Sequence, residues 1–520
     1  MAWHVASKEV FYALVQASFL NNRKQMHARK SFTTLALLFN IFMVAGSAFA
    51  QSTGGNNIRE IGSRRELFVD YWLIDSMKNT QLVMHEPVDR GIALPFNNPS
   101  WEAVQCTYAT VLQDDTVFRL YYRAGIKGTD DFGFQVTAYA RSKDGVNWTK
   151  PELNLFSHQG NTRNNIVLTN SKGDLAVHNF SPFIDKRPGI PAAEKYKALG
   201  GVGKGLYAYV SADGIQWRRM LETPVLTKAA FDGQNVAFWS ESEQQYVCFY
   251  RTWTGPGNYQ GFRSVGRAVS KDFINWTMEG KMDFGNTPAE HLYINQTSPY
   301  FRASHIYIGT AARYVTGRSA LTIEQTKPLK LDMGYYTAAR EGVSDAVLLS
   351  SRGGTRMERT FLSSFIRPGI GDHNWVSRSN FPALNVVQTG PAEMSVFVVQ
   401  DYAQPGNHLH RYSMRLDGFA SVQAAYSGGS MLTKPFTFSG GNLFLNYSTS
   451  AAGGIAVEIT DPQGKAIPGF EAGKCNLLIG NEIHRKVSWS GNPDLKALNG
   501  KAIRIRFIMK DADLYALKFE

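Results

Sequence analysis

The chain has 520 residues, 43% of them hydrophobic and 19% charged, a balance typical of soluble globular proteins with room for a large core. The formal charge of +12 comes from basic residues that are scattered and form no run, which argues against a nucleic-acid partner or a basic membrane-binding patch. The three cysteines lie far apart, so neither a disulfide framework nor a Cys-x-x-Cys metal site is indicated.

The N-terminus has the pattern of a secretory signal peptide. Basic residues come before an apolar run at about residues 35–45, and a small-residue sequence, Ala-Phe-Ala, ends at Ala50. The apolar run is shorter than the roughly 20 residues that a membrane-spanning helix needs. We therefore predict that residues 1–50 are a signal peptide, removed after Ala50, and that the mature protein is periplasmic or extracellular without membrane insertion. Translation can begin at residue 1 or at Met26, and the sequence does not decide between the two.

A seven-residue pattern, Ser-x-Asp-[Gly/Phe]-x-x-Trp, occurs three times, at Ser142–Trp148, Ser211–Trp217 and Ser270–Trp276. In each copy a strand-like segment, in which apolar and polar residues alternate, ends at the Ser, and the Trp begins another such segment. Asp can accept hydrogen bonds from the turn backbone, and Gly tolerates positive φ. Each copy therefore predicts a tight turn between strands, with the Asp and the Trp in structural roles. Weaker copies lie near residues 350 and 413.

The spacing of these turns predicts a five-bladed β-propeller. The first three copies start 69 and 59 residues apart, which suits a four-stranded blade better than a small solenoid repeat. Paired strands precede each turn, and five such units fill residues 66–428. Residues 430–520 also contain segments of alternating apolar and polar residues but lack the repeated turn, so we expect a separate C-terminal β-sandwich. The predicted fold is all-β, and an array of sandwiches is the alternative to the propeller.

This combination resembles the superfamily of glycoside hydrolase families 32 and 43, over the whole mature chain. The repeated turns are also similar to the sialidase Asp box, which has one more residue between Asp and Gly. The family 32 elements "WMNDPNG", "RDP" and "EC" do not occur in this sequence. The resemblance therefore implies the fold and a glycosidase activity, while the catalytic residues have to be predicted from position.

Polar residues that open the innermost strand of each blade are expected to face the central cavity. Four of the five predicted openings carry a carboxylate, and glycoside cleavage needs one protonated and one ionised carboxyl group. We predict that Asp232 and Glu290 are catalytic, with Glu102 as a third member. The alternative for each is a strand-end contact or a bond to sugar hydroxyls. The predicted substrate-binding residues are Trp101, His178, Asn179, Gln234, Asn235, His291 and Glu393.

The sequence thus predicts a secreted glycoside hydrolase that acts on plant or algal polysaccharide fragments and needs no metal and no cofactor. The alternative is a non-catalytic, lectin-like propeller that binds carbohydrate. Phosphorolysis stays open as well, because Arg123, Arg251 and Arg313 end inner hairpin strands and could supply a phosphate site. Resemblance to family 43 implies inversion at the anomeric carbon, whereas family 32 implies retention.

Overall fold

The computed structural model describes residues 58–520 except 99–100, 126–134, 171–172, 174 and 332–341. The predicted signal peptide and its cleavage site lie outside the described residues. Within the described part, no helix has the length and apolar character needed to cross a membrane. Residues 56–520 form one compact unit, and the three cysteines are unpaired.

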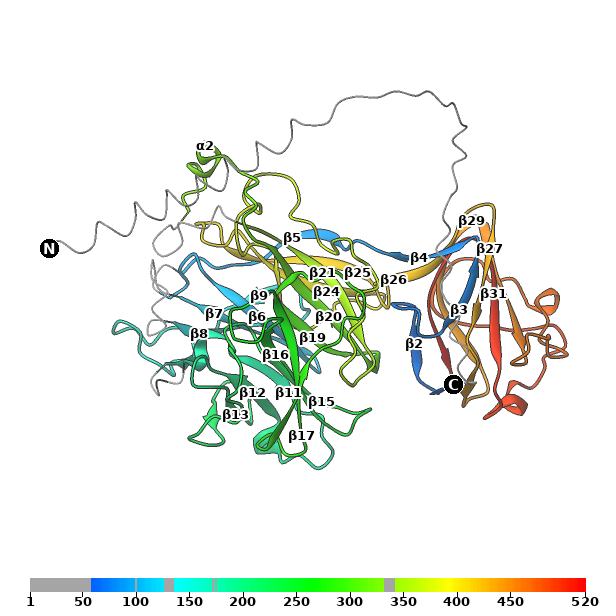
Figure 1. The fold of residues 1–520 in the computed structure, drawn as a ribbon, viewed down its shortest axis with the longest axis horizontal. Helices are drawn as coiled ribbons and strands as arrows, with labels where there is room; N and C mark the ends of the chain where they lie inside the picture. Colours follow the sequence, from blue (N-terminus) through cyan, green and yellow to red (C-terminus); the bar gives the residue numbers. More distant parts are fainter. Residues whose placement is uncertain (1–57, 99–100, 126–134, 171–172, 174, 332–341) are drawn as a thin grey trace, which may run out of the picture. The chain divides into compact units, whose positions relative to one another are not determined.

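Antiparallel sheets follow one another around a ring and form the five blades of the predicted propeller (Figure 1). The first blade contains β6 (Thr107–Asp114), β7 (Val117–Ala124), β8 (Val136–Ser142), β9 (Trp148–Thr149) and β10 (Ile166–Thr169). The second contains β11 (Ser181–Ile184), β12 (Tyr196–Gly200), β13 (Tyr207–Ser211) and β14 (Arg218–Arg219). The third contains β15 (Val236–Ser240), β16 (Gln245–Trp253), β17 (Arg263–Ser270) and β18 (Trp276–Lys281). The fourth contains β19 (His291–Tyr300), β20 (Ala303–Val315) and β21 (Val343–Ser351), and one short helix, α2 (Ile323–Thr326), follows β20.

The fifth blade closes the ring with a strand from the N-terminal side. Its innermost segments are β22 (Phe381–Pro382) and β23 (Val387–Gln388), followed outward by β24 (Glu393–Gln400), β25 (His408–Arg415) and β5 (Val88–Pro95). Leu384, between β22 and β23, exchanges backbone hydrogen bonds with β6 of the first blade. The sequence placed the inner strand of this blade at Glu393, but that residue opens the second strand. The true inner segments are only two residues long each, too short for a periodicity argument.

Buried amides fill the axis midway along the inner strands. The Gln296 side-chain amide donates to Gln234 Oε1 and, at 3.1 Å, to the Pro382 carbonyl, while Gln234 Nε2 donates to Thr110 Oγ1 at 2.9 Å. These groups come from four different blades and link those blades to one another. At the end where the inner strands finish, a largely apolar cavity of about 140 Å³ is lined by residues that include Leu112, Phe183, Trp239, Pro299 and Val386.

The repeated turns have the predicted structural role. In the first copy Asp144 Oδ1 accepts from the Val146 and Asn147 amides, each at 2.8 Å, and the second and third copies repeat these bonds. The hydrogen bonds, led by that from the Asn147 backbone, hold the pKa of Asp144 well below its usual range. Trp217 packs edge-on against Phe180 in its own blade and Tyr121 in the blade before, with ring centroids 5.0 and 6.1 Å away. The repeat is therefore a device for joining neighbouring blades.

The C-terminal module is a curled antiparallel sheet that also recruits strands from the start of the chain. Its long strands are β29 (Leu443–Thr460) and β31 (Arg504–Phe519). The other members are β2 (Arg65–Leu67), β3 (Ile74–Lys78), β4 (Thr80–Met84), β26 (Ala420–Ala424), β27 (Gly429–Thr433) and β30 (Asn481–Lys486). Beside it, β1 (Arg59–Gly62) pairs in parallel with β28 (Phe436–Phe438). Residues 66–84 and 420–424, which the sequence analysis assigned to the propeller, lie in segments that pair in this sheet. For β26, the partner strands lie more than 300 positions earlier and about 90 positions later in the sequence.

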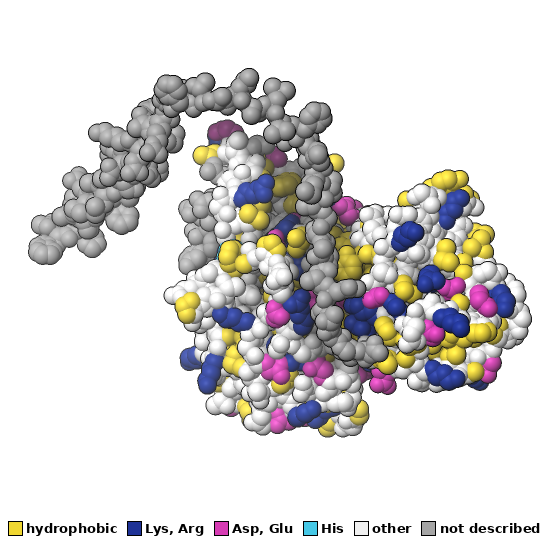
Figure 2. Space-filling model, turned by 45° about the vertical axis from the view of Figure 1, so that its right-hand side comes forward, with side chains coloured by type: hydrophobic (Ala, Val, Ile, Leu, Met, Phe, Trp, Pro, Cys, Tyr) yellow, Lys and Arg dark blue, Asp and Glu magenta, His cyan; other side chains and the backbone are white. Residues whose placement is uncertain are grey.

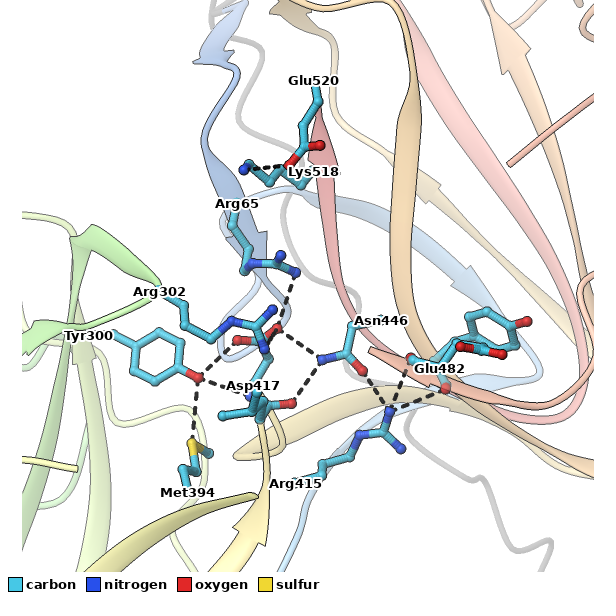
Figure 3. Close-up of polar contacts among 12 residues, drawn as sticks. Arg65, Tyr300, Arg302, Met394, Arg415, Asp417, Asn446, Glu482, Lys518 and Glu520 are labelled. Atoms are coloured by element: carbon cyan, nitrogen blue, oxygen red, sulfur yellow. Dashed lines mark hydrogen bonds and ion pairs between the residues drawn. The ribbon is translucent and has the colours of Figure 1, made fainter. Parts of the chain in front are cut away.

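A buried carboxylate joins the propeller to the C-terminal sheet (Figure 3). Asp417 accepts from Tyr300 Oη at 2.9 Å on the fourth blade, and from Asn446 Nδ2 at 2.9 Å and Arg65 Nη1 at 3.2 Å on the sheet. Arg302 approaches the same carboxylate at 3.3 Å. The two modules are therefore linked through one shared anion.

Charged side chains of both signs are interspersed on the face shown in Figure 2. No extended basic area is present on that face among the described residues. This distribution agrees with the scattering of Lys and Arg along the sequence.

Candidate functional site

At the end where the inner strands begin, residues from all five blades converge on one cluster. We call it the axial cluster, and it consists of Tyr108, Arg123, His178, Asp232, Arg251, Arg263, Tyr293, Arg378 and Tyr402. Its members stand at or next to the ends of strands, where the turn backbone leaves their side chains free to point toward the axis.

On one side of the cluster, Arg123 joins three blades. Its guanidinium carbon lies 4.7 Å from the centroid of the Tyr108 ring, its Nη1 lies 3.3 Å from His178 Nδ1, and its Nη2 donates to Tyr402 Oη at 3.4 Å. Burial lowers the pKa of His178 well below its usual value, and the charges of Arg123 and Arg378 lower it further. The imidazole is therefore neutral at pH 7 and serves as a hydrogen-bonding group.

Asp232 is held on a fixed piece of backbone. The carbonyl of Phe231 accepts from Asn179 Nδ2 at 2.7 Å and from Asn235 Nδ2 at 3.1 Å, and the carbonyl of Gly233 accepts from the same two amides at 2.9 and 2.8 Å. Phe231 has a φ of 54°, a left-handed conformation that costs free energy for a non-glycine residue. The bonds on both flanks stabilise this conformation and aim the carboxylate of Asp232.

Asp232 pairs with Arg251, whose Nη1 donates to its Oδ1 at 3.1 Å. Gly233 makes this approach possible, because a Cβ at that position would lie 2.7 Å from Arg251 Nη2. The Asp232 side chain is about a quarter exposed, so it can also contact a ligand.

Three arginines surround Tyr293 on the other side of the cluster. The guanidinium carbons of Arg263, Arg251 and Arg378 lie 4.8, 5.0 and 5.9 Å from the centroid of its ring. Burial acts to raise the pKa of Tyr293, but the positive charges of Arg378, Arg251 and Arg263 outweigh it, so the pKa lies below its usual value. This part of the cluster has a strongly positive potential.

The other predicted residues near the axis are buried supports. Asn179 is fully buried and, besides its two bonds described above, donates to the Gly201 carbonyl at 3.0 Å. Gln234 belongs to the amide belt across the axis, and Asn235 accepts from the Arg251 amide at 2.9 Å. His291 lies at the edge of the cluster, where its Nδ1 accepts from the Arg263 amide at 3.0 Å. The first three therefore position the site, although the sequence analysis placed them against the substrate.

Two of the predicted carboxylates have no contact with Asp232 among the described residues. Glu102 is 3% exposed and is held by Lys150 Nζ at 2.6 Å and by the Tyr122 hydroxyl, inside the first blade. Glu290 lies between Arg313 and Arg359, on the wall of a cavity of about 220 Å³ between the third and fourth blades. Both carboxylates are engaged by cations that stand far from them in the sequence.

Trp101, Glu393 and Arg313 also lie away from the axial cluster. Trp101 is packed in the core of the first blade, and its indole donates to Asn165 Oδ1 at 2.7 Å. Glu393 begins β24 at the opposite end of the fifth blade, where it contacts Thr389 Oγ1 at 3.0 Å and Arg411. Arg313 is bound to Asp345 as well as to Glu290. None of the three has a contact with Asp232 among the described residues.

Sequence reasoning missed Tyr108, Arg263, Tyr293, Arg378 and Tyr402. Tyr108 and Tyr293 stand one or two residues inside their strands, whereas the prediction covered the polar residues that open them. Arg378 precedes β22, and it would have been found if that short strand had been identified as the inner strand of the fifth blade.

Within the described residues, no group of three or more His, Cys, Asp or Glu side chains is arranged to hold a metal ion. The charge of Asp232 acts on Tyr108, Tyr259, Arg263 and Tyr293. Among the described residues the cluster is therefore rich in guanidinium and phenol groups and has a single acid.

Comparison with known proteins finds only distant structural similarity. No protein-family model matches the chain, and no curated protein matches it. A solved structure described as a glycoside hydrolase is similar at 13% identity and a TM-score of 0.43, covering 64% of this chain and 92% of its own. A glycosyl hydrolase from Bacteroides ovatus is similar at 13% identity and a TM-score of 0.38, covering 68% and 97%. A GH32 β-fructofuranosidase from Bombyx mori is similar at 10% identity and a TM-score of 0.41, covering 82% and 94%. Similarities this low assign neither a family nor an activity, and the predicted five-bladed propeller is confirmed by the strand topology of the protein itself.

Proposed function

We propose that the protein cleaves a glycosidic bond in a carbohydrate bound at the axial cluster, with Asp232 as the group that transfers the proton. The observation that supports this proposal best is the placement of Asp232. Of the three predicted catalytic carboxylates, it is the one with a contact to the axial cluster among the described residues, and the carbonyls on either side of it accept four hydrogen bonds.

Asp232 would act as a general acid toward the glycosidic oxygen. Cleavage breaks the bond between the anomeric carbon and that oxygen, and a proton delivered to the oxygen makes it a better leaving group. The phenol rings of Tyr108, Tyr293 and Tyr402 offer apolar faces and hydroxyl groups for the sugar. Water, or inorganic phosphate in a phosphorolytic reaction, would then attack the anomeric carbon, and the proton that the attacking group loses would return to Asp232 through solvent.

A non-catalytic, carbohydrate-binding propeller is the second candidate, and one observation favours it. Paired carboxylates are the usual machinery of glycoside cleavage. Glu102 and Glu290 are instead engaged in ion pairs away from Asp232. A binder requires the positioning groups of the cluster but no second acid.

Substitution of Asp232 distinguishes the two candidates. Fragments of arabinan, xylan, fructan and algal galactan would be screened for release of new reducing ends. Loss of a general acid typically lowers turnover about 10²- to 10⁴-fold, so Asp232→Asn should abolish cleavage of the active substrate while the melting temperature is kept.

Glu290→Gln is the matched control, because its carboxylate is engaged by two arginines and has no contact with Asp232 among the described residues. It should retain turnover within a few-fold. Equal turnover of the parent and Asp232→Asn would remove Asp232 from the chemistry, and saccharide binding without any turnover in the parent would establish the lectin-like function.

A further inference from the structure

The positive charge of the axial cluster exceeds its negative charge. Arg123 and Arg263 have no carboxylate partner among the described residues, and Arg251 shares the single carboxylate of Asp232. Arg123 and Arg251 are 8% and 4% exposed. Buried charges are normally paired, because an unpaired guanidinium loses its hydration without compensation.

Individual donors in this region also lack acceptors. Arg251 Nη2 and Arg263 Nε are buried and have no hydrogen-bond partner in the described parts of the chain. Both guanidiniums lie at about 5 Å from the centroid of the same ring, that of Tyr293. Two guanidinium groups beside one ring, each with a donor that has no acceptor, are suited to an oxyanion, which accepts several charge-assisted hydrogen bonds at once.

The pKa values of two side chains, His178 and Tyr293, also indicate a positive electrostatic potential in the axial cluster. The charges of Arg123 and Arg378 act with burial to lower the pKa of His178, and the arginines around Tyr293 lower its pKa against the effect of burial. Since His178 is neutral, the excess charge of the cluster comes from the arginines. A neutral sugar would leave this charge uncompensated.

We infer that Arg251 and Arg263 bind an oxyanion beside Tyr293, supported by the positive charge of Arg123. This inference rests on the proposed function, because it names the substrate class of the same site. The oxyanion comes either from the sugar itself, as a uronic acid carboxylate or a sulfate ester, or from free inorganic phosphate as the attacking group. In the second case a phosphate oxygen replaces the glycosidic oxygen on the anomeric carbon, and the Asp232 proton passes to the leaving oxygen.

Binding measurements at low ionic strength test this inference without turnover. Galacturonate oligomers, galactose oligomers, inorganic phosphate and sulfate would be titrated by calorimetry. At least one of the anions should bind about tenfold more tightly than the neutral oligomer, a difference of ~1.4 kcal/mol, and the preference should fall as salt is added. A preference for galacturonate identifies the sugar as the source, whereas binding of phosphate, with phosphate-dependent release of a sugar phosphate, identifies free phosphate.

Variants give effects of opposite sign. Arg251→Gln and Arg263→Gln should each weaken anion binding about tenfold or more, since each removes an unsatisfied donor. Asp232→Asn should strengthen anion binding several-fold, because it removes the carboxylate that competes with the anion for Arg251. Arg367→Gln is the control, as its side chain is 69% exposed and pairs only with an exposed glutamate among the described residues; it should leave binding unchanged.

The result separates this inference from the proposed function. Equal affinity for neutral and anionic ligands, or anion binding that is unchanged in both Arg251→Gln and Arg263→Gln, would overturn the inference even if a neutral glycan were cleaved. Anion binding that depends on these arginines, in a protein that cleaves nothing, would support it while the proposed function failed. A melting curve for each variant identifies one that is unfolded, and the remaining arginine variant then decides.

Discussion

The carbonyl oxygens on either side of Asp232 each accept hydrogen bonds from two buried amides, those of Asn179 and Asn235. These amides come from the second and third blades, so the position of the carboxylate depends on how the two blades meet. Asn179 Oδ1 also accepts from the Gly201 amide at 2.8 Å, so both the oxygen and the nitrogen of its side-chain amide are engaged. Asn179 is therefore a positioning residue for Asp232.

Replacement of Asn179 by alanine should reduce both stability and activity. Buried carbonyls at Gly201, Phe231 and Gly233 would lose a donor, and a buried group without its partner costs about 1–3 kcal/mol. Denaturant unfolding should show this loss, and kcat should fall while KM changes little, because the carboxylate is misplaced and not removed. A variant with unchanged kcat would show that Asn179 is structural only.

At the scale of the element, the repeated turn combines a fixed backbone with a ring that packs on the neighbouring blade. Gly145, Gly214 and Phe273 occupy the same place in the three copies, with φ values of 72°, 72° and 69°. A Cβ at Gly145 would lie 2.9 Å from Thr389 of the fifth blade, so glycine is needed where the blades are closest. Phe273 adopts the strained conformation in the third copy and is fully buried, and its packing offsets the strain.

Trp217→Ala should destabilise the propeller without altering the axial cluster. The indole packs between the first and second blades and is partly buried, and aromatic truncations in cores cost about 3–5 kcal/mol. Calorimetry should place the loss near the lower end of that range, with ligand binding kept in the folded fraction. If the variant melted like the parent but lost binding, the packing role of this residue would be refuted.

The elements that could be predicted are those with a local signature. The strands before Trp148, Trp217 and Trp276 show alternating apolar and polar residues and end in the repeated Ser-x-Asp turn. The blades that contain these strands are as predicted. The short strands β22 and β23 and the pairing of β3 and β4 with the C-terminal sheet have no such signature, because their partners lie far away in the sequence. The site could be predicted in part for the same reason. Asp232 and His178 were predicted because they precede inner strands, whereas the ion pairs of Glu102 with Lys150 and of Glu290 with Arg359 depend on tertiary contacts that the sequence does not show.

For the whole molecule, two buried networks connect the propeller to the C-terminal sheet. Besides Asp417, the carboxylate of Glu66 on β2 lies 2.8 Å from His305 Nε2 and 2.6 Å from Arg352 Nη1, both on the fourth blade. Glu66 is 1% exposed. Breaking a buried pair by removing one partner costs about 3–5 kcal/mol, so these contacts stabilise the arrangement of the two modules.

The Glu66 network predicts a loss of stability in acid. Burial acts to raise the pKa of Glu66, but the hydrogen bond with His305 and the charge of Arg352 outweigh it, so the pKa lies below the usual 4.5. A carboxyl group with a lowered pKa stabilises the folded state above its unfolded pKa, and this contribution disappears as pH falls through the folded value. The stability difference between the parent and Glu66→Gln should therefore be largest at neutral pH and shrink below about pH 4.5. A difference that is constant from pH 7 to pH 3 would contradict the account.

A crystal structure of Asp232→Asn with the best-bound saccharide tests the central claim most directly, because it locates the reacting bond. The account predicts a saccharide in contact with Tyr293 and Arg251, with its glycosidic oxygen about 2.6–3.2 Å from the side chain at position 232. A saccharide bound in the apolar cavity at the opposite end of the axis, or only on the C-terminal sheet, would contradict it.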